Sequence, residues 1–259
     1  MLMFELTWQT FLVVCPLVFL AGLVDSIAGG GGLISLPAYL ICGVPAHHAL
    51  ATNKLSSCIG TTVSTARYIK KGYANWKLGI PSILLAICGS MIGARLVLMV
   101  DERVVQYLLL GCLPVIAFFM LRKKDMEVPE EVRQAMPKKR QMFIVLAASF
   151  LIGCYDGFYG PGTGTFLLLV YTQLAKLDVR TSSGNVKLVN LSSNFGSLIV
   201  FLSNNECVIP LGLAAGAFCL LGHYIGAGMV IKNGGRVVKP IILVVMVLLF
   251  VKVISGLWS

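Results

Sequence analysis

Apolar residues fill most of this chain in long runs that short polar joints separate. The runs lie at about residues 8–28, 33–43, 49–68, 78–100, 104–121, 141–158, 163–175, 186–204, 209–231 and 237–256. A bilayer core needs about 20 apolar helical residues to cross it. Most runs approach that length, but 33–43 and 163–175 are shorter and suggest broken or re-entrant helices. The pattern predicts an all-α integral membrane protein with about 8–10 transmembrane or re-entrant helices.

Composition agrees with this fold class and changes the interpretation of the charge. Of the 259 residues, 57% are hydrophobic and 12% are charged, whereas soluble domains carry about 25% charged residues. The net charge of +10 would suit a nucleic-acid partner. The basic residues, however, lie at joints between apolar runs and form no stripe with interleaved aromatics. We therefore expect the lipid bilayer as a partner, and no nucleic acid.

The basic joints also predict an orientation. The loop 122–140 holds seven Lys and Arg residues, and such loops stay on the cytoplasmic side of a membrane. The loop divides the chain into a first membrane repeat at 8–121 and a second membrane repeat at 141–256. The joints near Asp101 and Glu206 hold few basic residues and are expected outside.

The two halves share polar and glycine residues in the same order. Asp25 and Asp156 lie 131 positions apart, and Lys54 and Lys187 lie 133 apart, so one two-residue insertion reconciles the offsets. Five segments per half is an odd number, and the second half would enter the membrane from the opposite side. The sequence thus predicts two inverted-topology repeats, a recurring feature of alternating-access carriers. The alternative is a duplication kept only for folding.

Each half contains a glycine-rich break before a short apolar run. The breaks read Asp25-Ser-Ile-Ala-Gly29-Gly30-Gly31-Gly32 and Asp156-Gly-Phe-Tyr-Gly160-Pro161-Gly162-Thr163-Gly164. Glycine is a poor helix former, and broken backbone at membrane depth survives only against protein or a water-filled cavity. Free N–H groups at the next helix start would face an anion, although close helix packing is an alternative reason for small residues. The candidate substrate-binding residues here are Gly30, Gly31, Gly32, Gly162 and Thr163.

A second polar cluster opens another helix in each half. It reads Thr52-Asn53-Lys54-Leu55-Ser56-Ser57 in the first half and Gly184-Asn185-Val186-Lys187-Leu188-Val189-Asn190 in the second. An ammonium offers a point charge to an oxyanion, while amides and hydroxyls donate hydrogen bonds to its oxygens. Snorkelling of the lysines and helix packing by the hydroxyls are the alternatives. The candidate substrate-binding residues here are Asn53, Lys54, Ser57, Asn185, Lys187 and Asn190.

Asp25 and Asp156 are candidates for coupling or for helix capping. A carboxylate inside a membrane is costly and is a functional candidate by default. Each could cap the helix that follows it, which we favour, or could take up protons during transport. His223, whose counterpart in the first half is Ser90, is expected to be a packed or hydrogen-bonded helix residue.

Other chemistry has little support. The eight cysteines form no C-x-x-C pair, so we expect neither a disulfide frame nor a metal site. No H-E-x-x-H, G-x-S-x-G or Walker A motif occurs. We therefore expect no enzyme, no catalytic residues and no cofactor.

These motifs resemble the sulfite exporter TauE/SafE family, a broad group of probable membrane transporters. The resemblance extends over about residues 11–253 and rests on the two glycine breaks together with Ala51-Thr52-Asn53-Lys54. It implies a carrier in the plasma membrane of a prokaryote that moves sulfite, a sulfonate or another organic anion. A passive anion channel, or a membrane subunit of a larger complex, is the alternative, and the oligomeric state is left open.

Overall fold

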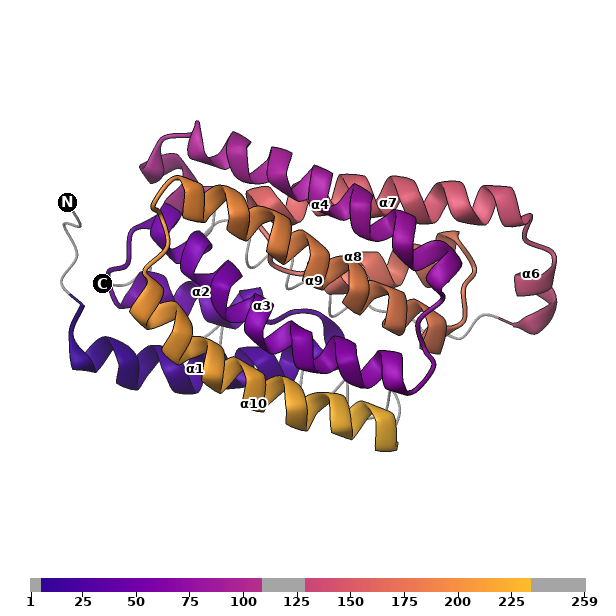
Figure 1. The fold of residues 1–259 in the computed structure, drawn as a ribbon, viewed down its shortest axis with the longest axis horizontal. Coiled ribbons are helices and arrows are strands. Elements are labelled where there is room, and N and C mark those ends of the chain that lie inside the picture. Colours follow the sequence, from indigo (N-terminus) through magenta and orange to yellow (C-terminus); the bar gives the residue numbers. More distant parts are fainter. Residues whose placement is uncertain (1–5, 109–128, 234–259) are drawn as a thin grey trace.

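The computed structural model describes residues 6–108 and 129–233, and every regular element within these ranges is helical (Figure 1). The run 237–256, most of the run 104–121 and the first part of the loop 122–140 lie outside the described residues. The described helices are α1 (Trp8–Ala28), α2 (Gly32–Ile41), α3 (Ala46–Lys70), α4 (Trp76–Leu98), α6 (Glu130–Gln134), α7 (Lys138–Phe158), α8 (Thr163–Leu169) with its π-helical extension η1 (Val170–Leu174), α9 (Val179–Ser203) and α10 (Ile209–Asn233).

Five of these helices are long and apolar enough to cross a membrane, namely α1, α4, α7, α9 and α10. The two short predicted runs are also helical, as Gly32–Ile41 and Thr163–Leu174. The run predicted at 49–68 is part of α3, which is 25 residues long but is not among the five. Its buried residues include Thr52, Asn53 and Lys54, so α3 is a polar helix enclosed by apolar ones.

The described part of the molecule turns its apolar surface outward. Phe143, Leu151 and Leu84 are each more than 60% exposed, while Thr52 and Ser193 are fully buried. Such a distribution would be unfavourable in water, but lipid tails solvate the outer side chains and the polar groups satisfy one another inside. The all-α integral membrane fold predicted from the sequence is therefore confirmed.

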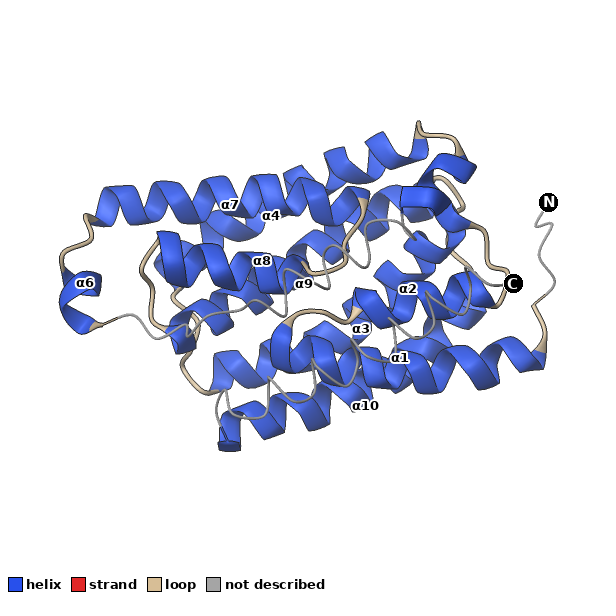
Figure 2. Cartoon of the chain, turned by 180° about the vertical axis from the view of Figure 1, so that it is seen from behind, coloured by secondary structure: helices blue, strands red, loops and turns tan. Residues whose placement is uncertain are grey.

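The helices pack as two bundles that meet in the middle of the molecule (Figures 1 and 2). One bundle, called here the first bundle, contains α1, α2, α3 and α10, and the second bundle contains α4, α7, α8 and α9. Each bundle thus takes three helices from one half of the chain and one from the other. Helices α3 and α9 pack against each other across the boundary between the bundles.

Corresponding helices of the two halves run in opposite directions. In Figure 1, α1 and α3 run from left to right, whereas α7 and α9 run from right to left. The packing partners correspond as well, because α1 packs on α10 and its counterpart α7 packs on α4. These directions and partners agree with an inverted-topology repeat, which stays a prediction.

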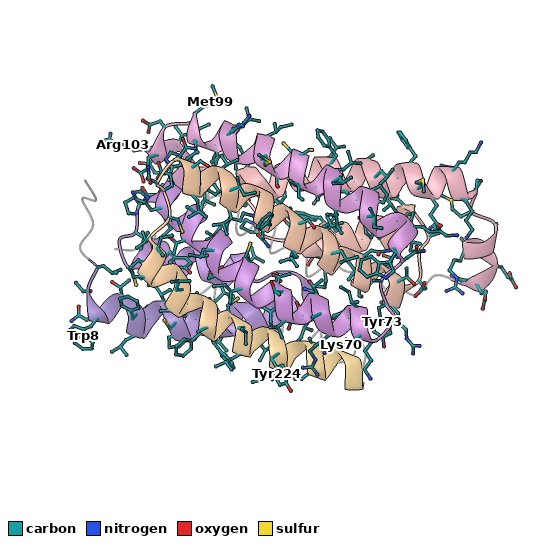
Figure 3. All side chains as sticks on the ribbon, viewed as in Figure 1. Trp8, Lys70, Tyr73, Met99, Arg103 and Tyr224 are labelled. Carbon is teal, nitrogen blue, oxygen red and sulfur yellow. The ribbon has the colours of Figure 1, made fainter. Side chains whose placement is uncertain are left out.

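The polar joints gather at the two ends of the bundles. Trp8, Met99 and Arg103 lie at one end, and Lys70 and Tyr73 lie at the other (Figure 3). The joint after α4 and the joint before α4 are therefore on opposite sides, as the charge pattern predicts. Which end faces the cytoplasm stays a prediction.

Candidate functional site

The two glycine breaks lie against each other at the boundary between the bundles. Gly29 ends α1 with a φ of 78°, a left-handed conformation that glycine adopts without strain. A Cβ atom on Gly29 would lie 2.6 Å from the backbone of Gly164, and one on Gly164 would lie 2.7 Å from Gly29. Only glycine permits this approach, so the breaks serve close packing of the two bundles.

The second break carries a buried ion pair. Asp156 on α7 accepts from Lys54 Nζ at 2.8 Å, and the two side chains are 3% and 2% exposed. Ser193 Oγ donates to Asp156 Oδ2 at 2.7 Å, and Thr163 Oγ1 donates to Oδ1 at 2.8 Å. The carboxylate is therefore held by three short hydrogen bonds. Gly160, with a φ of 96°, leaves room for the ammonium beside it.

The first break carries a looser version of the same arrangement. Lys187 Nζ donates to the backbone oxygen of Asp25 at 2.6 Å and lies 3.4 Å from its Oδ2. Asn190 Nδ2 also donates to Oδ2 at 3.4 Å, and Gly31 N donates to Oδ1 at 3.2 Å. His223 Nε2 completes the surroundings at 3.6 Å from Oδ2. Asp25 keeps 17% of its side chain exposed.

Both ion pairs join the two halves of the chain and the two bundles. Lys54 and Asp25 lie in the first bundle, whereas their partners Asp156 and Lys187 lie in the second. The aspartates also take part in the helix starts that follow them, Asp25 through Gly31 N and Asp156 through the Thr163 hydroxyl. Asp25 thus adds a backbone N–H bond to its ion pair, whereas Asp156 bonds the Thr163 hydroxyl and, within the described residues, caps no backbone N–H of α8.

A small cavity of about 30 Å³ lies between the ion pairs. About 10–15 Å³ of such space holds one water molecule, so the cavity has room for a compact polar group. Eight of the thirteen candidate residues line it, and they come from both halves of the chain. They are Asp25, Gly31, Gly32, Asn53, Lys54, Ser57, Asp156 and Asn190.

The other five candidate residues do not line this cavity. Lys187 and Thr163 act on the two aspartates. Gly162 is the residue before α8, with a φ of 83°, and Gly30 O accepts from Leu33 N at the start of α2. Asn185 Oδ1 accepts from Asn75 N at 3.1 Å, which ties α9 to the start of α4. The start of α2 therefore borders the cavity, whereas that of α8 does not.

Sequence reasoning gave too small a role to His223. The prediction of a hydrogen-bonded helix residue is confirmed, because Nδ1 lies 3.0 Å from Ser64 Oγ. The ring also lines the cavity beside Asp25, which the prediction did not include. The signal in the sequence is the break in the repeat, since Ser90 stands at the matching position. Ser35, Gly160, Asn194 and Cys219 line the cavity as well.

The lysine charges are not free in this arrangement. Lys54 and Lys187 were predicted to offer point charges to an oxyanion, but each faces a carboxylate. An unpaired ammonium at membrane depth is costly, and pairing reduces this cost. Neutral donors therefore have to supply part of the attraction for an anion. Asn53 is one candidate, because it lines the cavity and its side-chain NH₂ group is a neutral hydrogen-bond donor.

Metal binding has no support in the described residues, where no three His, Cys, Asp or Glu side chains come together in a metal-binding group. The chemistry of the cavity is instead that of amides, hydroxyls, a glycine backbone and two ion pairs. Such a set can hold a small polar ion by hydrogen bonds.

Known proteins are similar to this chain over almost its whole length. The family model described as "Sulfite exporter TauE/SafE" matches residues 14–253. A Sinorhizobium protein named "Probable membrane transporter protein ORF9" is 34% identical over 92% of this chain and 89% of the relative. The "Probable membrane transporter protein YfcA" of Escherichia coli (strain K12) is 31% identical over 96% and 94%. No solved structure matches the chain.

Proposed function

Because the chain belongs to the sulfite exporter TauE/SafE family of membrane transporters, we propose that it carries a small oxyanion across the plasma membrane by alternating access. The observation that carries this proposal is the cavity between the two bundles, lined from both halves by hydroxyl and amide groups, the Lys54 ammonium and the paired carboxylates of Asp25 and Asp156. Binding sites at the interface of related halves are characteristic of secondary carriers.

The substrate that suits the cavity best is compact. A volume of about 30 Å³ admits little more than the space of two water molecules. An anion of the size of sulfite fits once the side chains of Ser57 and Asn190 move slightly. A sulfonate with a bulky organic group fits only when the bundles separate. Sulfite is therefore the first substrate to test, and small sulfonates come second.

The proposed motion is a rocking of the first bundle against the second. The two halves form an inverted repeat in this proposal, supported by the opposite directions of corresponding helices and by the two ion pairs that cross the boundary. Helices α3 and α9, which meet at the boundary, would be the axis. A bound anion can then compensate an ammonium whose aspartate moves away, which links occupancy to the motion.

Flux into proteoliposomes tests the function. Purified protein is reconstituted, and uptake of radiolabelled sulfite is followed at alkaline pH, where sulfite is fully ionised. We expect saturable uptake that unlabelled sulfite inside the vesicles accelerates, because a carrier exchanges substrate between two conformations. Uptake that is linear in concentration and has no such acceleration would indicate a passive channel instead. Inserted protein without sulfite flux would refute the substrate assignment.

A further inference from the structure

His223 is a buried titratable group that the anion site itself does not require. It lies on α10, is 1% exposed and borders the cavity. Its Nε2 atom lies 3.6 Å from Asp25 Oδ2, and its Nδ1 atom lies 3.0 Å from Ser64 Oγ. The matching position of the first half is occupied by Ser90. The imidazole is therefore a feature of only one of the two related sites.

The ring of His223 lies between a hydroxyl and a carboxylate. Ser64 Oγ is 3.0 Å from Nδ1 and 3.1 Å from the Thr61 carbonyl, and Asp25 Oδ2 is 3.6 Å from Nε2. Either ring nitrogen can carry the hydrogen of the neutral imidazole. The protonated ring has a hydrogen on both nitrogens, so it can donate to Ser64, whose own hydrogen then goes to Thr61, and to the carboxylate of Asp25. The surroundings of the ring therefore suit the protonated form.

We propose that Asp25 and His223 form a proton-binding site and that one proton bound there accompanies the transported anion. The inference rests on the proposed transport function and adds the coupling ion to it. With this proton bound, the Nε2–H group of the imidazolium faces Oδ2, and the two can form a charge-assisted hydrogen bond. The proton also weakens the attraction between the Asp25 carboxylate and Lys187.

The related pair in the second break is unsuited to this role. Asp156 accepts three hydrogen bonds of 2.8 Å or less, from Lys54, Ser193 and Thr163. Asp25 has its ammonium, amide and imidazole neighbours at 3.4–3.6 Å and is more exposed. Proton binding at Asp156 would break good hydrogen bonds, whereas at Asp25 it creates one. In this proposal Asp156 links the two bundles through its ion pair, and Asp25 binds the coupled proton.

The charge balance of the site explains why proton and anion travel together. Two lysines and two aspartates cancel when His223 is neutral, so the site has no net charge to attract an anion. One added proton gives the site a charge of +1, and in a medium of low dielectric constant this charge and that of an anion stabilise each other. Each ligand therefore raises the affinity for the other.

Within the described residues, no neighbour of the pair is a better proton acceptor. Lys187 reaches the pair from α9 and is cationic, and the Lys54–Asp156 pair borders the same cavity. The thiol of Cys219 on α10 also lies beside Asp25, and a thiol is a weak acid. The charged and titratable groups that face the pair from the described elements are therefore Lys187 on α9, Lys54 on α3, Asp156 on α7 and Cys219 on α10.

Counting protons per anion tests this inference. Proteoliposomes loaded with a trapped pH-sensitive dye receive sulfite at an equal alkaline pH inside and outside, where sulfite itself releases or takes up few protons. For the wild type we expect the lumen to acidify by about one proton for each sulfite taken up. The variant His223→Gln can still hydrogen-bond Ser64 but cannot bind the proton. We expect it to lose the acidification per sulfite, measured as a ratio and so independent of the amount of active protein.

His47→Gln is the matched control, because His47 lies away from the cavity and bonds the carbonyl of Val97 at 3.0 Å. This variant should keep the wild-type ratio. Should His223→Gln not insert, Asp25→Asn replaces it and is expected to lose the acidification too. Wild-type sulfite flux without protons, or an unchanged ratio in His223→Gln, would overturn the inference and leave the transport function standing. Absence of sulfite flux in the wild type would overturn the transport function itself.

Discussion

Lys54 Nζ lies 2.8 Å from Asp156 Oδ2, and the pair links the first half of the chain to the second in a region closed to solvent. The related pair of Lys187 and Asp25 is longer, at 3.4 Å, and its carboxylate is more exposed. Two sites with the same residues therefore differ in strength. The difference follows from the neighbours, since Ser193 adds a 2.7 Å hydrogen bond to Asp156 only.

The first prediction is that Lys54→Met destabilises the protein more than Lys187→Met. Removing one partner of a buried ion pair leaves an unpaired charge and costs about 3–5 kcal/mol. Asp156 has only hydroxyl donors left to compensate, whereas Asp25 keeps some contact with solvent and a backbone N–H donor. Thermal unfolding of the purified variants in detergent measures the difference. Equal losses would contradict the inequality of the two sites.

The double variant Lys54→Met/Asp156→Asn is the control for this prediction. It removes both charges, so the penalty of an unpaired carboxylate disappears and much of the stability should return. A double variant as unstable as Lys54→Met alone would mean that lost packing of the lysine stem, rather than the unpaired charge, causes the effect.

The second prediction separates backbone strain from crowding at the glycine break. Gly29 and Gly72 both have a positive φ, of 78° and 73°. A Cβ atom on Gly72 would meet nothing within 4 Å, whereas one on Gly29 would lie 2.6 Å from the backbone of Gly164. Gly72→Ala should cost about 1–2 kcal/mol from the left-handed conformation alone. Gly29→Ala should cost about 1–3 kcal/mol more because the bundles must move apart.

Unfolding of the two glycine variants in the same detergent measures this comparison. A Gly29→Ala variant that is no less stable than Gly72→Ala would show that the breaks are not packed against each other as the structure describes. Reduced transport by Gly29→Ala is expected as well, because the cavity lies beside the same break.

The helices of this fold can be predicted well from the sequence, because the lipid surroundings impose the same requirement for apolar helical residues on every membrane-crossing segment. Apolar runs of about 20 residues have to be helical in lipid, and α4, found at Trp76–Leu98, agrees with the run 78–100. Helix α3 shows the limit of this reasoning. Its polar residues are buried by neighbouring helices, and hydropathy along one segment does not say which segments surround it.

The sequence singles out the members of the two ion pairs but not how they pair. Repetition marks Asp25, Lys54, Asp156 and Lys187 as a set, since charged residues at matched positions rarely coincide by chance. The pattern does not show that each lysine meets the aspartate of the other half, because that depends on the packing of α3 against α9. His223 was undervalued for a related reason, since a search for repeats selects residues that match, whereas His223 is marked by the mismatch with Ser90.

The third prediction concerns the start of α9. Asp178 caps this helix by accepting from Thr181 N at 2.9 Å. Burial opposes its ionisation, but the bonds from Thr181 and the charge of Arg133 outweigh burial and hold the pKa of Asp178 below its ordinary value. A lowered pKa stabilises the fold above the unfolded pKa of about 4, and this contribution is lost as the pH falls through the folded pKa.

The variant Asp178→Asn tests that contribution, because asparagine caps a helix about as well as aspartate but carries no charge. At pH 7 the wild type should be more stable by a few tenths of a kcal/mol, a small value because the carboxylate is partly exposed. The advantage should begin to fall near pH 4 and should vanish only below the folded pKa of Asp178. Unfolding temperatures of both proteins over this pH range measure it, and a constant difference would contradict the charge argument.

The last prediction concerns two asparagines of α9, one expected to affect substrate binding and the other to affect stability. Asn190 borders the cavity, whereas Asn185 ties α9 to the start of α4 through Asn75 N. Asn190→Ala removes a donor from the anion site, and a hydrogen bond to a charged group contributes about 1.5–3 kcal/mol. We expect the KM for sulfite to rise about tenfold or more in Asn190→Ala. Asn185→Ala should lower the unfolding temperature and leave the KM unchanged. Uptake kinetics in proteoliposomes decide between them, and an unchanged KM in Asn190→Ala would place the anion outside this cavity.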